Sequence, residues 1–146
     1  MDKDKSILIG SDHAAYELKE KIKVYLSDKG YHVDDAGTKS TASVNYVKYG
    51  KKVASAVSQG QYIKGILLCG TGLGMSMVAN RFLNVRAALC SDIFSAEMSR
   101  RHNDSNILVL GGRMLGDMLA FALVQAWLTT EFEGGRHLER IQSIDN

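Results

Sequence analysis

The sequence predicts a single α/β domain in which one parallel β-sheet lies between two layers of helices. The chain has 146 residues, the size of one ordinary domain. Short apolar runs alternate along it with longer segments of helical periodicity, a pattern typical of parallel sheets covered on both faces. No linker, repeat or low-complexity segment divides residues 1–146. We therefore expect a three-layer, Rossmann-like sandwich with a five-stranded parallel sheet.

Five short runs rich in apolar residues are predicted to be the strands. The third run, Ile66–Cys69, is apolar throughout, as expected of a strand that is buried on both faces. Polar or glycine residues follow most of the runs and mark their ends. The strands are predicted at Ile7–Ile9, Tyr31–Asp35, Ile66–Cys69, Val85–Cys90 and Ile107–Leu110.

Helical periodicity occupies the segments between the strands. Leu18, Ile22 and Leu26 recur at helical spacing, and Gly30 behind them is a typical C-terminal cap. The helices are predicted from Leu18 to Leu26, from Tyr46 to Val57, from Met75 to Arg81, from Ser91 or Asp92 to about His102 and from Leu115 to Thr130, followed by a short terminal helix after Gly135.

Composition and charge exclude several classes of protein. Charged residues make up 23% and apolar residues 45%, near the globular averages, which excludes a disordered tail, a coiled coil and a collagen-like repeat. The net charge of +2 is too small to indicate a nucleic-acid partner. No run approaches the roughly 18–20 apolar residues of a membrane span, and no secretory signal is visible. Two cysteines make no disulfide framework, so a cytoplasmic location is expected.

The predicted topology brings two polar segments together. In sheets of this kind, ligands bind beyond the carboxyl ends of the strands, where the winding direction reverses. For a flavodoxin-like start, that point lies between the first and third strands. The residues just past these strands are Ser11-Asp12-His13 and Cys69-Gly70-Thr71-Gly72. The two segments are therefore expected to lie side by side at a ligand site.

Glycines at positions 70, 72 and 74 follow the third strand. Such spacing lets backbone N–H groups converge on one point at the start of a helix, an arrangement that binds anions. The pattern is neither the dinucleotide fingerprint G-x-G-x-x-G nor a P-loop with its lysine, which disfavours a nucleotide-binding module. The alternative is a tight turn that needs glycine for its geometry alone.

Each of the two cysteines ends a predicted strand, but we expect them to have different roles. Cys69 directly precedes the glycine turn, where amides and a helix dipole favour a thiolate that can act as base or nucleophile. The alternative is a buried structural cysteine. Cys90 has no glycine-rich turn behind it, so we expect it in the core.

Several polar side chains have both a functional and a structural interpretation. Asp12 can be a site residue or a helix N-cap, and His102 ends a helix where cations are favoured in any case. Arg136 and Arg140, four residues apart, form with Arg113 either a phosphate clamp or part of a solvated cationic tail. His32 and His137 have weaker cases. The four histidines show no metal-ligand spacing, so no metal site is expected.

Five segments together carry a family resemblance: Gly10–His13, Cys69–Gly74, Ser99–Asp104, Gly111–Arg113 and Gly134–His137. In order and spacing they resemble the type B ribose-5-phosphate isomerase family, which also includes galactose-6-phosphate isomerase. The resemblance covers nearly the whole chain. It implies aldose–ketose isomerisation of a phosphorylated sugar through an enediolate, with no metal and no other cofactor.

The resemblance also implies roles for individual residues. The catalytic thiol of the family matches Cys69, and its ring-opening histidine matches His102. The turn from 70 to 74 matches its oxyanion cradle. We therefore expect catalytic roles for Cys69, Thr71, His102 and Asp12, and substrate binding by His13, Tyr46, Gly70, Gly72, Gly74, Asn103, Arg113, Arg136 and Arg140.

The chain departs from the family pattern beside one of these residues. The family often has Asp-Tyr-Pro where this chain has Asn45-Tyr46-Val47, so a carboxylate and a rigid turn are lost. Ribose 5-phosphate is the expected substrate, and a 6-phosphate hexose (allose or galactose) is the alternative. A non-catalytic sugar-phosphate sensor is a further alternative, although binding alone requires neither Cys69 nor His102.

The order of the elements also predicts an assembly. The helix after the fourth strand is expected to run back to the opposite sheet edge, because the fifth strand starts only a few residues after His102. His102 is then far from Cys69 of its own chain. If both serve one site, a neighbouring subunit supplies the histidine, so we expect a homodimer or a dimer of dimers with shared sites.

Overall fold

A computed structural model describes residues 2–146 and confirms the predicted α/β sandwich. The five strands form one parallel sheet in the order β2-β1-β3-β5-β4. Because β1 lies directly beside β3, the winding direction reverses between them, as expected. The strands are β1 (Ser6–Ser11), β2 (His32–Asp35), β3 (Lys64–Cys69), β4 (Ala87–Leu89) and β5 (Ile107–Gly111).

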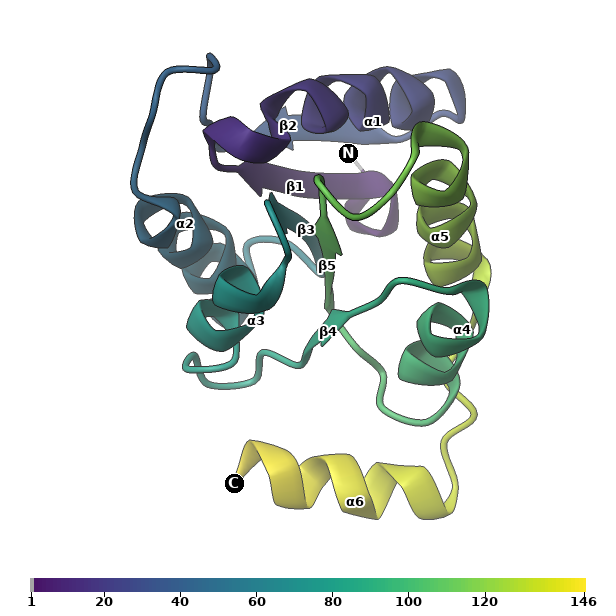
Figure 1. The fold of residues 1–146 in the computed structure, drawn as a ribbon. Coiled ribbons are helices and arrows are strands. Elements are labelled where there is room, and N and C mark those ends of the chain that lie inside the picture. Colours follow the sequence, from purple (N-terminus) through teal and green to yellow (C-terminus); the bar gives the residue numbers. More distant parts are fainter. Residues whose placement is uncertain (1) are drawn as a thin grey trace.

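Helices cover both faces of this sheet (Figure 1). One face carries α1 (Tyr16–Asp28), α4 (Ile93–Arg101) and α5 (Asp117–Thr129), and the other carries α2 (Tyr46–Ser58) and α3 (Leu73–Ala79). The terminal helix α6 projects below both layers. Within residues 2–146, no helix is both long enough and apolar enough to cross a bilayer. The remaining helical elements are α6 (Arg136–Asp145) and two 3₁₀ turns, η1 (Lys3–Lys5) and η2 (His13–Ala15).

Alternate residues of the strands point into two separate cores. On β3, Ile66 and Leu68 belong to the core beneath α1, α4 and α5, while Leu67 and Cys69 belong to the core beneath α2 and α3. Ile66, Leu67 and Leu68 are all fully buried. The continuous apolar run therefore predicted a central strand correctly, because both of its faces are covered.

Two element boundaries differ from the sequence prediction for identifiable reasons. β4 has three residues rather than six, because its one partner, β5, begins at Ile107, which pairs with Ala87. Helix α3 begins at Leu73 rather than Met75, because Gly72 takes a left-handed conformation (φ 82°) from which the helix starts. Gly74 consequently lies inside the first turn of α3 and not in the preceding loop.

A buried ion pair fixes the carboxyl end of β2 against α1. The Lys19 side chain is fully buried, and its Nζ lies 2.5 Å from Asp35 Oδ2, which also accepts a 2.8 Å bond from Lys23. The Gly37 N–H donates to the other oxygen of Asp35. Burial alone raises the pKa of Asp35, but these bonds outweigh it and hold the pKa below its usual value. This stabilisation is present above the unfolded-state pKa and is lost as pH falls through the lower folded-state pKa.

Replacing Asp35→Asn is expected to lower the free energy of unfolding by about 3 kcal/mol, because it breaks a pair whose cation stays buried. Glu20, 3.2 Å from Lys19, keeps the loss at the low end of the usual range. Urea unfolding at pH 7 measures the change. The matched control is Asp117→Asn, which removes the exposed pair with Lys21 and is expected to cost at most about 1 kcal/mol. Equal losses in the two variants would contradict the assignment.

Candidate active site

The ends of β1 and β3 bring the first group of predicted residues together. Ser11 and Leu68 are register partners, and the Asp12 N–H donates to the Leu68 carbonyl at 3.2 Å. The segments that follow the two strands therefore start side by side at the carboxyl edge of the sheet, as the topology predicted.

The Cys69 thiol lies just beneath this edge. Cys69 is 6% exposed, and its Sγ accepts a hydrogen bond from the Gly72 N–H at 3.2 Å. The exposed Thr71 caps the next amide, because its Oγ1 accepts from the Leu73 N–H. A Cβ on Gly72 would lie 2.4 Å from the Leu89 side chain. Gly72 also has a positive φ of 82°, so its turn needs glycine for geometry alone, as the structural alternative held.

The predicted anion cradle is correspondingly smaller than the glycine pattern indicated. The Gly72 amide points at the sulfur and is not free for a ligand. The first bond within α3 runs from the Ser76 N–H to the Gly72 carbonyl. The amides of Gly74 and Met75 therefore have no acceptor within the helix and can meet an anion at its first turn.

The Tyr46 ring packs directly on Gly74. A Cβ at Gly74 would lie 2.6 Å from two ring carbons, so only glycine allows this approach. Tyr46 is the first residue of α2, and the Asn45 side chain caps that helix by accepting from the Val47 N–H at 3.0 Å. Asparagine therefore keeps the capping function that an aspartate would have at this position.

Asp12, His13 and Arg113 complete the group at the carboxyl edge. Asp12 Oδ1 accepts from the Ala15 N–H at 3.2 Å, so this oxygen is an N-cap, as the structural alternative held. His13 Nδ1 accepts from the Val44 N–H at 3.1 Å, which places the proton of the neutral ring on Nε2. Arg113 lies over Gly70, where an added Cβ would be 3.5 Å from the Arg113 Cδ. We call Asp12, His13, Tyr46, Cys69–Gly74 and Arg113 the rim cluster.

A second group surrounds His102, which is the C-cap residue of α4. Its ring stacks on that of His137, with centroids 4.3 Å apart and 13° between the planes. Glu133 Oε1 lies 3.9 Å from His102 Nε2 and 3.5 Å from His137 Nε2. Desolvation, followed by the neighbouring His102 and Arg136, lowers the pKa of His137. We call His102, Asn103, Glu133, Arg136, His137 and Arg140 the arm cluster.

The sequence prediction missed Glu133 and gave His137 only a weak case. Gly134 and Gly135 both have positive φ (69° and 58°), so the chain reverses before α6 begins. The Glu133 N–H also donates to the Arg101 carbonyl at 3.0 Å. The reversal brings both side chains onto His102. The glycine pair signalled a turn, but not which residues it would bring together.

The rim cluster and the arm cluster occupy opposite ends of the sheet. Cys69 pairs with Gly111 at the carboxyl end of β5, whereas His102 precedes Ile107 at its amino end. The length of β5 alone separates these ends by roughly 13 Å, at about 3.3 Å per residue. One chain therefore does not bring Cys69 and His102 together, as the order of the elements predicted.

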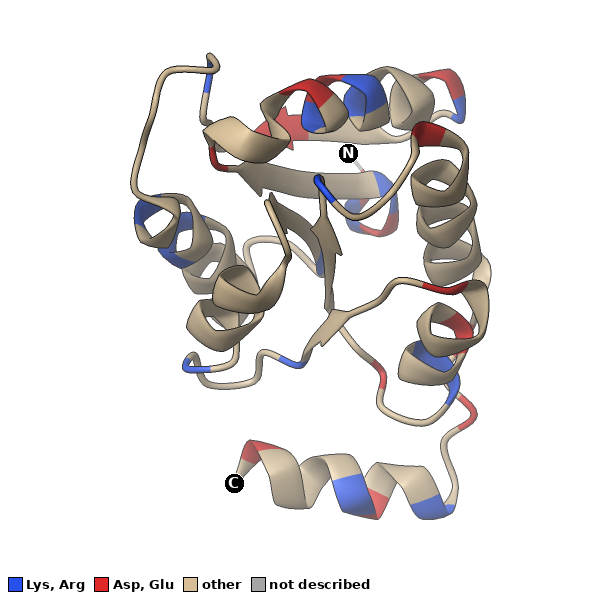
Figure 2. Cartoon of the chain, in the orientation of Figure 1, with Lys and Arg blue, Asp and Glu red and all other residues tan. Residues whose placement is uncertain are grey.

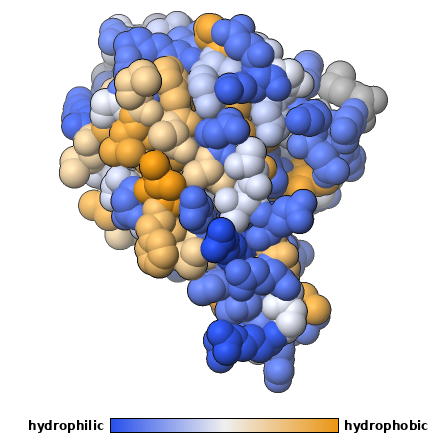
Figure 3. Space-filling view, turned by 90° about the vertical axis from the view of Figure 1, so that its right-hand side faces the viewer, coloured by the Kyte–Doolittle hydropathy of each residue, from blue (hydrophilic) through white to orange (hydrophobic). Residues whose placement is uncertain are grey.

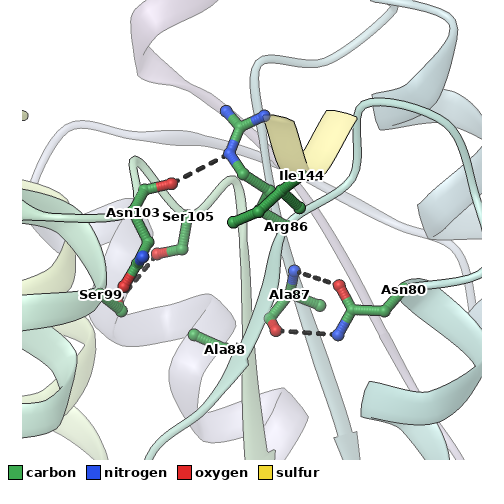
Figure 4. Close-up of a pocket in the computed structure, with 8 residues that line it drawn as sticks. All are labelled: Asn80, Arg86, Ala87, Ala88, Ser99, Asn103, Ser105 and Ile144. Carbon is green, nitrogen blue, oxygen red and sulfur yellow. Dashed lines mark hydrogen bonds between the residues drawn. The ribbon is translucent and has the colours of Figure 1, made fainter. Parts of the chain in front are cut away.

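A cavity of about 220 Å³ lies beside the arm cluster, between β4 and α6 (Figure 4). Arg86 crosses it, donating to the Asn103 carbonyl at 2.9 Å and pairing with Asp145 at 2.6 Å. The Ser99 and Ser105 hydroxyls bond to each other at 2.8 Å on one wall. Of the predicted site residues, this cavity includes only Asn103, so it is not the predicted thiol site.

The charge distribution favours an anion near the rim cluster. Helix α1 carries interleaved basic and acidic residues, whereas α2 carries Lys48, Lys51 and Lys52 and no acidic residue (Figure 2). Tyr46 starts this cationic helix, so the positive field lies beside the rim cluster. A thiol, an arginine and free amides at the winding reversal define the class as an α/β enzyme for a small anionic substrate.

Comparison with known proteins identifies the family. A model of the Ribose/Galactose Isomerase family matches residues 7–144. Ribose-5-phosphate isomerase B of Escherichia coli is 45% identical over 140 residues, covering 96% of this chain and 94% of its own. D-erythrulose-4-phosphate isomerase of Pectobacterium atrosepticum is 41% identical over 140 residues, covering 95% and 92%. The ribose 5-phosphate isomerase structure from Thermotoga maritima, 54% identical, has a TM-score of 0.93 and covers 96% and 97%. The chain therefore belongs to the Ribose/Galactose Isomerase family, a family of sugar-phosphate isomerases.

The two free cysteines are expected to differ in reactivity. Cys90 is 2% exposed, and burial raises the pKa of its thiol to about 11, so it carries little thiolate at pH 8. Iodoacetamide at pH 8, followed by peptide mass spectrometry, should label Cys69 first, because Cys69 lies at the sheet edge beside α3. Labelling of Cys90 should rise only as pH approaches 11. In urea both cysteines should react, and preferential labelling of Cys90 in the folded protein would contradict this placement.

Proposed function

We propose that this enzyme interconverts ribose 5-phosphate and ribulose 5-phosphate through an enediolate, with Cys69 as the base. The observation that carries the proposal is the position of the Cys69 sulfur at the carboxyl end of β3, where it accepts from the Gly72 N–H. In the turn that follows, Gly70 lies against Arg113 and Gly74 against Tyr46. Two of the relatives named above bear the name of this reaction's aldose. No metal or other cofactor takes part in the proposed reaction.

The proton transfer requires one base and one stabilised oxygen. Moving the carbonyl between C1 and C2 takes a proton from one carbon and returns it to the other, and a Cys69 thiolate can do both. Negative charge develops on the enediolate oxygen. The first-turn amides of α3, at Gly74 and Met75, with Thr71 beside them, are the proposed donors. Removing one such donor typically costs about 2.7–4 kcal/mol of transition-state stabilisation.

Ring opening and phosphate binding use the remaining residues. The cyclic sugar must open before isomerisation, and the His102 imidazole is proposed to move the proton that ring opening transfers. Asn103 beside it is proposed to contact the sugar. His13, Arg113, Arg136 and Arg140 are proposed to hold the phosphate, whose binding energy orients the reacting carbons (all four positions lie in the rim or arm cluster).

A homodimer with shared sites would bring the rim cluster of one chain together with the arm cluster of the other. Exposed apolar side chains gather on the face that carries α4 and α5, beside the carboxyl edge (Figure 3). A contiguous apolar area of this kind marks an association surface. We infer that a second copy docks there with its arm cluster against the rim cluster of the first. The exposed apolar residues of this region are Leu89, Ile93, Phe94, Met114 and Met118, and Leu73 of α3 adjoins them at the carboxyl edge.

The two residues that flank Tyr46 support a second substrate class. Asn45 and Val47 replace the aspartate and proline often found on either side of the sugar-contacting tyrosine. The loss of a carboxylate changes which sugar hydroxyls can be bound, so a 6-phosphate hexose, allose or galactose, is the alternative substrate. A non-catalytic sensor is disfavoured, because phosphate binding needs neither Cys69 nor His102. The free thiols of Cys69 and Cys90 accord with a proposed cytoplasmic location.

Cys69→Ala is expected to lower turnover of ribose 5-phosphate by about 10²–10⁴-fold, the usual contribution of a general base. Binding of inorganic phosphate should be kept. A coupled assay with ribose 5-phosphate, allose 6-phosphate and galactose 6-phosphate measures turnover. The matched control is Cys90→Ala, which should keep turnover, because Cys90 is buried in the core on the opposite face of the sheet from Cys69. Full activity in Cys69→Ala would refute the thiol base, and absence of turnover in the unaltered enzyme with all three sugars would favour the sensor.

Mixing inactive subunits tests the shared site. Cys69→Ala and His102→Ala chains, each inactive alone, should regain activity when combined, because one of the two sites in a mixed dimer would have both groups intact. Up to about half the activity per mixed dimer is expected from this count of sites. Differently tagged chains allow the mixed species to be purified and verified. Verified mixed dimers without recovered activity would show that both groups come from one chain.

A further inference from the structure

Three side chains of the arm cluster form a potential metal site. His102 closes α4, Glu133 lies in the segment before α6, and His137 lies in the first turn of α6. One donor atom from each lies within 4.8 Å of the other two. Both Nε2 atoms face the same Glu133 oxygen, at 3.9 Å and 3.5 Å. Three donors from separate elements therefore converge on one point.

The chemistry of these donors selects a class of ion. Two imidazoles and one carboxylate are a usual ligand set for zinc and related divalent transition metals, whereas magnesium and calcium prefer oxygen alone. Zinc–ligand bonds of about 2.0–2.2 Å place tetrahedral ligand atoms roughly 3.3–3.5 Å apart. The distances between the three donor atoms exceed this tetrahedral spacing by at most about 1.5 Å.

The side chains have room to close this difference. The His102 side chain is 43% exposed and that of Glu133 is 48% exposed, while His137 is almost buried. The two rings are stacked, so His102 must tilt out of the stack for both lone pairs to meet one ion. Its position at the end of α4 leaves that tilt open to solvent. His137 would stay fixed, and the two exposed ligands would move to it.

We propose that His102, Glu133 and His137 bind one divalent transition-metal ion, such as zinc, per chain. Histidine spacing in the sequence gave no sign of such a site, because His102 and His137 come from different elements and the turn at Gly134 and Gly135 joins them. The ion would tie the start of α6 to the end of α4.

The site has a consequence for catalysis that rests on the proposed function. A metal bound to His102 Nε2 occupies the lone pair that ring opening requires. Zinc at this site is therefore inhibitory, and a chelator restores turnover. Metal binding does not depend on the ring-opening role of His102, so either proposal can be refuted without the other.

Equilibrium dialysis against zinc, and the visible absorption of bound Co²⁺, measure the site without an activity assay. The unaltered protein should bind one ion per chain, with a tetrahedral Co²⁺ spectrum. Glu133→Gln and His137→Asn should each weaken binding by at least about tenfold, or about 1.4 kcal/mol. The matched control is His32→Asn, which removes an exposed histidine beside Asp34 and should bind normally. The Cys69→Ala background removes the rim thiol as a competing ligand.

Failure to bind any ion, or equal binding in Glu133→Gln and the unaltered protein, would overturn the proposal. Glu133 is exposed, so this variant decides the outcome even where His137→Asn fails to fold. Full turnover in a metal-free His102→Ala enzyme would instead refute the ring-opening role and leave the metal site standing. Zinc binding that is lost in Glu133→Gln, together with normal binding in His32→Asn, would support it.

Discussion

The parallel pairing of β1 with β3 is the constraint on which the site depends. It makes the winding direction reverse, so no crossover covers the edge between these two strands. The Asp12 amide bonds to Leu68 directly across this junction, and the Cys69 thiol follows one residue later. The buried, apolar β3 holds both in place, since neither face of the strand can shift without exposing its core. The position of the sulfur is thus a consequence of the sheet order.

The same sheet order explains why the proposed site residues lie in two groups. A helix that follows a parallel strand must return to the amino edge before the next strand starts. His102 closes such a helix, so it lies at the opposite end from Cys69. Helix α6 continues from that end below the two layers, with Arg136 and Arg140 exposed on it and Asp145 paired with Arg86 (Figure 1). A reaction that needs both ends requires a second copy, and the exposed apolar face beside the carboxyl edge offers a place for it.

Much of this arrangement could be predicted from the sequence, because it depends on local periodicity. Apolar runs predicted the strands, and the polar residues behind β1 and β3 predicted that the Asp12 and Cys69 segments lie side by side. The role of Tyr46 was expected from the family resemblance. The start of α3 was wrong by two residues, because periodicity does not reveal the left-handed conformation of Gly72. The cradle was overestimated for the same reason, since the Gly72 amide bonds to the sulfur. The Glu133–His137 pair was missed because it depends on a tertiary turn.

A crystal structure of the enzyme with ribose 5-phosphate bound would show whether one site combines groups from two chains. The measured quantity is the distance from each Cys69 sulfur to every His102 ring in the assembly. We expect the nearest His102 to belong to another chain and the sugar to lie between that ring and the sulfur. A nearest His102 from the same chain, or a sugar bound away from the sulfur, would contradict it.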